Sequence, residues 1–251
     1  MRADLEYDVS DVHVHFGEDS ILGTRVSARK LLNYVRSHDL KRVLAFSSDM
    51  RYQHYNRVLE DLIGLHKEIY GLVKVGLDYD KNEVFRLLRN PRFIGIKFHP
   101  SLDKSPVTNE IYVPLFKYLE KTGKVALIHC GRWQEVASYK FAFKIADNYP
   151  GLNVIIAHMG GIELPYCRDT IKLAQNAKNV LLETSNCYLP IVIEDAVKKL
   201  GDSRIMFGSD YPWGTCLGNV GTIVESNISE KSKKRILGGN FQNLLRRLNE
   251  K

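Results

Sequence analysis

Residues 124–130, KVALIHC, form a short apolar run that ends on a histidine and a cysteine. A run of this length and composition is typical of a buried strand. Eight such runs occur along the 251 residues, at 9–16, 42–48, 71–77, 93–99, 124–130, 153–159, 179–185 and 204–210. Segments with helical spacing separate most of them, for example at 27–38, 55–69, 82–90, 112–123 and 138–149.

The regular alternation of strands and helices predicts the fold class. Parallel strands that follow one another need helical crossovers of this kind. Eight units in 251 residues match the size of a (β/α)8 TIM barrel, so we expect one barrel domain over residues 1–251. A doubly wound open sheet is the alternative on pattern alone. The segment HFGEDSILG, residues 15–23, has no GxGxxG motif and argues against a dinucleotide-binding sheet.

Hydropathy and cysteine usage predict a soluble, cytoplasmic protein. The longest apolar runs, such as VALI at 125–128, are far too short to cross a bilayer. The segment MRADLEYDVSD, residues 1–11, lacks the apolar core of a signal peptide. The four cysteines contain no CxxC pair, which argues against a zinc ribbon or a disulfide scaffold and favours a reducing compartment.

The net charge of +7 lies almost entirely at the end of the chain. Residues 231–251 hold seven basic residues and one acidic residue, which leaves a net charge of +1 for residues 1–230. Basic residues on segments with helical spacing are typical of a solvated outer face. We therefore do not expect nucleic acid as a partner. We expect a small-molecule substrate and no membrane contact, and the sequence is compatible with a homo-oligomer.

The stretch SDVHVHF, residues 10–16, raises the question of a metal site. On a strand Asp11, His13 and His15 would share one face, and Val12, Val14 and Phe16 the other. A partly exposed strand with hydrogen-bonded histidines gives the same pattern, so this stretch alone does not establish a metal site.

A barrel would place further polar residues beside these histidines, because functional groups in such barrels lie at the C-terminal ends of the strands. There the sequence places His13, His15, Lys97, His99, His129, His158 and Asp210. By strand parity His129 follows Val125 and Leu127, His158 follows Val154 and Ile156, and Asp210 follows Met206 and Gly208. We expect each polar residue to cap an inward-facing row. Asp11 is expected deeper on the same face as His13, as a supporting residue.

Six motifs together resemble a known family. DVHVHF, GIKFHP, IHCG, AHMGG, GSDYP and ILGGNFQNLL are similar to the amidohydrolase superfamily. The resemblance is to the amidohydrolase-related branch, which includes aminocarboxymuconate semialdehyde decarboxylase, resorcylate decarboxylases and lactone-hydrolysing relatives. It implies a metal-dependent (β/α)8 barrel in which His13, His15, His129 and Asp210 are metal ligands. His158 would bind a second metal in a binuclear member, and would contact substrate or water in a mononuclear one.

Lys97 leaves the number of metals open. In binuclear relatives a lysine of the fourth strand is carboxylated and bridges two metals. Lys97 lies on that strand, but His99 lies one step further towards the mouth, so either could reach the site. Alternatively, Lys97 neutralises Asp210 or Asp11, or holds a substrate anion. We favour one ion over two.

The residue types suggest the chemistry. Three imidazoles and a carboxylate suit a divalent metal, with zinc favoured, and leave a position for water. Such an ion lowers the pKa of bound water from 15.7 to about 7. Asp210 is predicted to accept the proton of that water, and His158 to polarise the scissile carbonyl or to protonate the leaving group.

Loops after the strands are expected to select the substrate. The loop candidates are Arg51, Tyr52, His99, Ser101, Arg132, Trp133, Tyr211 and Trp213. Of these, His99, Arg132 and Trp213 are predicted to bind the substrate. Arg132 could pair with a carboxylate. Cys130 has the opposite parity to His129 and is expected to face the helices.

Three functions follow from this pattern. The main prediction is a metal-dependent hydrolase that acts on an amide, lactone or related ester. The alternative is a metal-dependent non-oxidative decarboxylase of a small aromatic or enoic acid, which uses the same metal cage but needs a cationic group for the departing carboxylate. A non-catalytic binding module is the least favoured, because every matched ligand position is filled.

Overall fold

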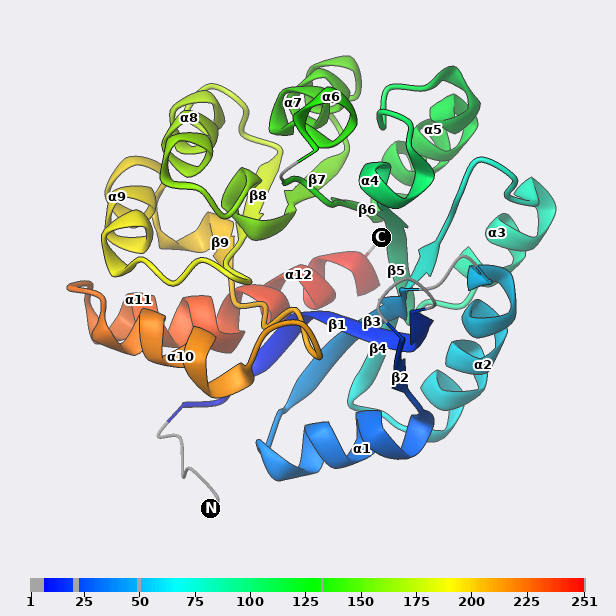
Figure 1. The fold of residues 1–251 in the computed structure, drawn as a ribbon, viewed down its shortest axis with the longest axis horizontal. Coiled ribbons are helices and arrows are strands. Elements are labelled where there is room, and N and C mark those ends of the chain that lie inside the picture. Colours follow the sequence, from blue (N-terminus) through cyan, green and yellow to red (C-terminus); the bar gives the residue numbers. More distant parts are fainter. Residues whose placement is uncertain (1–6, 20–22, 49–50, 132, 251) are drawn as a thin grey trace.

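The computed structural model describes residues 7–19, 23–48, 51–131 and 133–250, which alternate between strands and helices around a ring (Figure 1). The strands are β1 Ser10–Asp19, β2 Thr24–Val26, β3 Arg42–Ser47, β4 Ile69–Lys74, β5 Phe93–Phe98, β6 Val125–Ile128, β7 Asn153–Ile156, β8 Val180–Glu183 and β9 Ile205–Met206. Every predicted strand is present, although β4, β7 and β9 end three or four residues earlier than expected. The short β2, antiparallel to β1, was not predicted.

Helices follow the strands in the order that the sequence predicts. The α-helices are α1 Ala28–Ser37, α2 Tyr52–Leu65, α3 Lys81–Leu88, α4 Pro100–Asp103, α5 Val113–Thr122, α6 Gln134–Ala137, α7 Tyr139–Asn148, α8 Leu164–Ala174, α9 Pro190–Leu200, α10 Cys216–Glu225, α11 Glu230–Lys234 and α12 Asn240–Asn249. The 3-10 turns are η1 Glu110–Tyr112, η2 Ala157–Gly160 and η3 Asp202–Arg204, and η4 Arg235–Gly239 is a π-helix. No helix within these described ranges is long and apolar enough to cross a membrane.

The sheet closes into a barrel. Its order is β2-β1-β3-β4-β5-β6-β7-β8-β9, and every neighbouring pair from β1 and β3 onward is parallel. The chain after β9 then returns to β1. Phe207 O accepts from Val12 N at 3.0 Å, and Asp210 N donates to His13 O at 3.0 Å. These closing bonds exclude the open-sheet alternative and confirm the (β/α)8 barrel.

The C-terminal helix α12 fills one end of the barrel. Its Phe241, Leu244 and Leu245 belong to the same buried cluster as the inward-facing residues Val12, Leu44, Leu72, Val125, Leu127, Ile155, Leu181 and Met206. The Phe241 ring meets the edge of Tyr70, near the start of β4, with ring centroids 6.0 Å apart. In Figure 1, α12 lies across the ring of strands. The N-terminal end of the barrel is therefore closed, and the opposite end is left for polar side chains.

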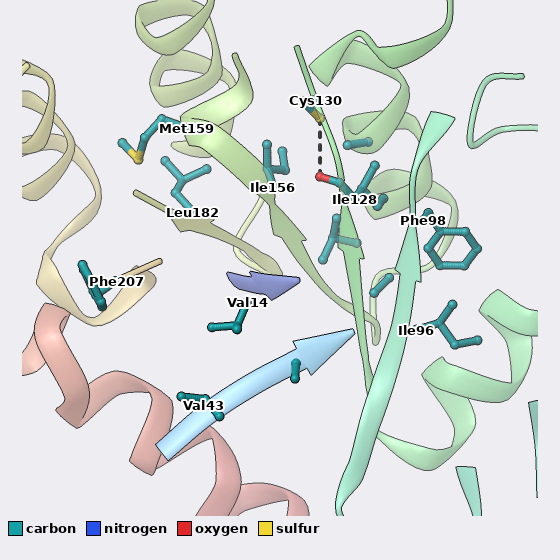
Figure 2. Packing of buried hydrophobic residues seen from close by; sticks show 14 of the residues in the cluster. Val14, Val43, Ile96, Phe98, Ile128, Cys130, Ile156, Met159, Leu182 and Phe207 are labelled. Atoms are coloured by element: carbon teal, nitrogen blue, oxygen red, sulfur yellow. Dashed lines mark hydrogen bonds between the residues drawn. The ribbon is translucent and has the colours of Figure 1, made fainter. Parts of the chain in front are cut away.

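The outward faces of the strands pack against the helices. Figure 2 shows part of this cluster, which includes Val43 of β3, Ile96 of β5, Ile128 of β6 and Ile156 of β7. Cys130 belongs to the same cluster, and its thiol lies 3.8 Å from the carbonyl oxygen of Ile128. The prediction that Cys130 faces the helices is therefore confirmed.

A bulge in β1 corrects the prediction for Asp11. The register with β3 shifts between Asp11 and Val14, so the strict alternation of faces fails here. Val12 belongs to the interior cluster, whereas Asp11 Oδ2 accepts a 2.6 Å hydrogen bond from Tyr34 of α1. Asp11 does not share the face of His13. It supports the site from outside, because its Oδ1 accepts from the backbone N–H of His13 and of Ser209, each at 3.0 Å.

A left-handed turn corrects the parity predicted for His158. Val154 and Ile156 face the helices, and Ile155 and Ala157 face the interior, so regular alternation would point His158 outward. Instead the chain turns at η2, where His158 and Met159 have φ values of 56° and 54°. Left-handed backbone costs a non-glycine residue about 1 to 2 kcal/mol. This strained turn directs the imidazole of His158 back into the barrel.

Candidate metal centre

Three side chains form a compact group at the open end of the barrel. His13 of β1, His158 of η2 and Asp210 after β9 each offer a ligand atom, and these atoms lie within 4.8 Å of one another. All three residues are buried. Residues that are up to 197 positions apart in the sequence meet here because the barrel brings the ends of its first and last strands together.

Asp210 connects this group to His15. Its Oδ1 lies 3.1 Å from His13 Nε2 and 2.9 Å from His15 Nε2. Its Oδ2 accepts a 2.6 Å hydrogen bond from Asn186 Nδ2, in the loop after β8. Burial acts to raise the pKa of Asp210, but His13 and His15 hold that pKa well below its usual value. The carboxylate is therefore ionised, and its position is fixed from both sides.

Glu183, at the end of β8, orients two of the imidazoles. Its Oε1 lies 2.9 Å from His13 Nδ1, and a carboxylate only accepts, so His13 Nδ1 carries the proton. The same oxygen accepts from Ser185 Oγ at 2.7 Å, and Ser185 Oγ lies 2.8 Å from His158 Nδ1. His158 N also donates to Glu183 Oε1 at 2.7 Å. With Nδ1 of each ring held in this way, Nε2 is the nitrogen that a neutral His13 or His158 would offer to a metal.

Sequence reasoning missed Glu183. The predicted strand 179–185 includes it, but a single glutamate matches no motif. A usable signal exists in the parity of that strand, because Leu181 belongs to the interior cluster and Glu183 follows it by two residues. Burial acts to raise the pKa of Glu183, yet His13, His158 and Ser185 hold that pKa at about 2. A fully buried carboxylate that stays ionised is a supporting element of the centre.

His129, after β6, adjoins the group through His158. His129 Nδ1 lies 3.1 Å from His158 Nε2, and the two rings meet nearly edge to face. Burial lowers the pKa of His129, of His158 and of His15, the last to about 4. These three imidazoles are neutral near pH 7, which is the form that binds a metal.

The donor atoms fit a divalent ion. His13 Nε2 lies 3.1 Å from the ionised Asp210 Oδ1, a position that either a proton on Nε2 or a metal ion in its place would satisfy. Burial and Lys97 act to lower the pKa of His13, but Glu183 and Asp210 together raise it, so this point of the centre favours positive charge. A divalent cation would satisfy both demands. Imidazole and carboxylate donors suit zinc and similar ions.

Lys97 lies on β5 and His99 directly follows it, and the two side chains have different neighbours. Lys97 Nζ lies 3.4 Å from His13 Nε2 and 4.4 Å from the centre of the Phe46 ring. Burial lowers the pKa of Lys97 to about 7. His99 stacks on His129, with ring centroids 3.9 Å apart, and its Nδ1 accepts from Leu102 N. Lys97 therefore adjoins the compact group directly, whereas His99 adjoins it through His129.

The other predicted loop residues are spread around the mouth. Trp213 adjoins His15, with the two ring centroids 6.5 Å apart. Tyr211 stacks on Tyr34, and Trp133 is 59% exposed. Arg132 lies outside the described residues. The structure thus gathers His13, His15, Lys97, His99, His129, His158 and Asp210 around one point, and their individual roles stay predictions.

Fold and centre define a class of protein: a (β/α)8 barrel with imidazoles and a carboxylate at its open end. The model of one family, described as amidohydrolase, matches residues 11–247. The chain therefore belongs to the amidohydrolase family. The predicted resemblance to this family is confirmed.

One curated relative and three solved structures are informative. Gamma-resorcylate decarboxylase from Polaromonas sp. is 30% identical over 118 residues, which are 40% of this chain and 36% of that protein. This match thus spans little more than a third of the length of the curated relative. In structure, the chain resembles 2,6-dihydroxybenzoate decarboxylase from Rhizobium, with a TM-score of 0.77, 16% identity, and 96% and 99% of the two chains covered.

The other two structures differ in the activity they are named for. Dihydroxybenzoic acid decarboxylase from Polaromonas sp. JS666, solved with bound manganese and an inhibitor, has a TM-score of 0.74, 14% identity and coverage of 96% and 97%. A candidate 2-pyrone-4,6-dicarboxylic acid hydrolase from Pseudomonas putida has a TM-score of 0.75, 16% identity and coverage of 96% and 98%. At these identities the likeness establishes the fold.

Replacing Glu183 by Gln should weaken metal binding while the barrel stays folded. The variant removes the charge that fixes the tautomer of His13 and supports His158 through Ser185. Loss of such an outer partner typically costs about 10- to 100-fold in metal affinity. Competition with a chelating dye measures this affinity for zinc and manganese, with circular dichroism as the check on folding. The exposed Glu110→Gln is the matched control, and equal affinities in both variants would contradict the role of Glu183.

Proposed function

We propose that the chain is a metal-dependent decarboxylase of a small aromatic carboxylic acid. The observation that carries this proposal is Lys97, a fully buried cation-forming side chain whose Nζ lies 3.4 Å from His13 Nε2. A departing carboxylate needs a cationic partner, whereas attack of water on a neutral lactone or amide does not. The decarboxylases among the similar proteins support the same choice. The main prediction from sequence, a hydrolase, is supported less well than its alternative.

The reaction breaks the bond between the ring carbon and the carboxyl carbon. The electron pair stays on the ring carbon, CO2 leaves, and a proton takes its place. A divalent ion held at the centre would supply a Lewis acid that binds substrate oxygens and stabilises the developing negative charge. We assign Lys97 to the substrate carboxylate. Asp210, which is ionised at rest, is assigned to taking a proton from solvent water and passing it to the ring carbon. His158 is assigned to holding the ion, because it belongs to the compact group with His13 and Asp210.

One ion is proposed rather than two. A single group, His13, His158 and Asp210, is able to hold a metal among the described residues, and Lys97 would have to be carboxylated before it could bind one. The donor set suits zinc, and manganese is the ion bound in one of the similar decarboxylases.

The four cysteines are buried and form no disulfide bonds, which supports the predicted cytoplasmic location.

The metal-loaded protein should release CO2 from dihydroxybenzoic acids and lose this activity on chelation. Reconstitution with zinc or manganese should restore it, and the better ion identifies the metal. The measurement is CO2 release, alongside a panel of lactones and amides. Turnover of the lactones with no CO2 from any aromatic acid would favour the hydrolase. Undiminished activity in a protein shown by elemental analysis to hold no metal would exclude both.

Replacing Asp210 by Asn should lower kcat by about 10²- to 10⁴-fold, the usual effect of removing a positioned proton donor. The amide keeps the size of the side chain, so the fold should persist in circular dichroism. The exposed Asp61→Asn is the matched control. Because Asp210 also faces two predicted ligands, metal content is measured in each sample. A variant with full metal content and unchanged kcat would show that another group carries the proton.

Replacing Lys97 by Met should raise KM for carboxylate substrates by about 10-fold or more, since a hydrogen bond to a charged group contributes about 1.5 to 3 kcal/mol. Methionine fills a similar volume without a charge. Steady-state kinetics at saturating metal measure the effect, with the exposed Lys117→Met as control. Loss of one equivalent of bound metal with an unchanged KM would instead identify Lys97 as a metal ligand.

A further inference from the structure

A second buried lysine lies outside the metal centre. Lys74, the last residue of β4, is 2% exposed. Its Nζ donates to Val75 O and, at 3.2 Å, to Asp103 Oδ1, and it lies 5.4 Å from the centre of the Tyr52 ring. A buried ion pair pays a desolvation cost that its own attraction barely offsets, so it adds little to stability. A role in binding would explain why it is retained.

Both partners of this pair adjoin the metal centre. Lys74 and Lys97 are directly paired in the register of β4 and β5, and neighbouring strands are about 4.8 Å apart. Asp103 belongs to α4, which begins directly after His99, and the His99 ring stacks on His129. The pair therefore lies at the same open end of the barrel as the metal centre, one strand away from Lys97.

A cavity of about 320 Å³ opens beside the pair. Its lining combines apolar walls with two lysines and two aspartates, so its formal charge is zero: Tyr52, Lys74, Gly76, Leu77, Asp78, Leu102, Asp103 and Lys104. This volume is at the lower end of the range for small-molecule sites, which start at about 300 Å³. We call this cavity the Lys74 pocket. Its size suits part of a ligand, and its neutrality gives no net attraction for a second anion.

Hydrogen bonding in the pocket favours a hydroxyl group. An ammonium has three donors, and Val75 O and Asp103 account for two of those of Lys74. Asp103 Oδ2 also accepts from Tyr112 at 3.2 Å, and a carboxylate has about four acceptor sites. Burial lowers the pKa of Lys74 and raises that of Asp103, so each charge is poorly solvated. A hydroxyl can accept from Lys74 while it donates to Asp103, which a carboxylate cannot do.

We propose that the Lys74 pocket binds a hydroxyl group on the end of an aromatic substrate remote from the metal centre. The inference rests on the proposed function, because the carboxylate at the other end of the ring must lie at the centre. Lys74 and Asp103 then determine specificity and take no part in bond breaking. They select hydroxylated rings over otherwise identical rings that lack the hydroxyl, because the latter leave two buried polar groups without the extra partner.

The test compares two probes that differ only in that hydroxyl. Calorimetry measures the binding of 4-hydroxybenzoate and of benzoate to the zinc-loaded and manganese-loaded protein. The wild type should bind 4-hydroxybenzoate about tenfold more tightly, the ratio expected for hydrogen bonds to charged groups. In Asp103→Asn and in Lys74→Met the ratio should fall towards one. The exposed Asp61→Asn and Lys117→Met should keep the ratio of the wild type.

The outcomes separate this inference from the proposed function. Equal binding of both probes by the wild type, or a preference that survives in both pocket variants, overturns the inference. Failure of the metal-loaded wild type to bind either probe overturns it together with the proposed substrate class. A preference that both variants lose supports the pocket even if no CO2 is released, in which case the proposed reaction alone is wrong. The probe comparison in the wild type needs no variant, so it stands even if Lys74→Met does not fold.

Discussion

The buried carboxylate of Glu183 is the group on which the centre depends. It accepts hydrogen bonds from His13 Nδ1, from Ser185 Oγ and from the backbone N–H of His158. The first two hold Nδ1 of His13 and, through Ser185, of His158, and the third stabilises the left-handed turn that brings His158 inward. Without this acceptor the turn would have to bear its backbone strain alone, and both imidazoles would be free to adopt the other tautomer.

Closure of the barrel and assembly of the centre involve the same residues. The backbone of Asp210 donates to His13 O, so the bond that joins the last strand segment to the first also brings the two side chains together. Asp11 accepts from His13 N and Ser209 N and fixes this junction from outside. An open end at this junction would therefore lose the metal group as well as the ring. This coupling explains why residues with φ values unusual for non-glycine, His158 and Asp210, are tolerated here.

Sequence periodicity predicted the fold because each strand is a separate apolar run with its own helix. It also predicted the facing of His129 and Asp210, which follow regular alternation after Val125, Leu127 and Met206. It failed at Asp11 and His158, where a bulge and a left-handed turn change the facing of the chain. Neither irregularity has a periodic pattern. Glu183 was missed because its importance comes from contacts with His13, 170 positions away, which no local motif contains.

The distribution of charge around the open end separates the two chemistries that the same cage could support. The acidic residues Glu183 and Asp210 lie at the end of β8 and after β9. The basic residues Lys97 and Lys74, which are paired in register, lie on β5 and β4. A neutral lactone would gain nothing from these two lysines. An aromatic acid would place its carboxylate between Lys97 and the metal group, and its ring would extend towards Lys74 and Asp103. In the proposed function, the two lysines rather than the imidazoles are therefore the groups that favour an aromatic acid over a neutral lactone.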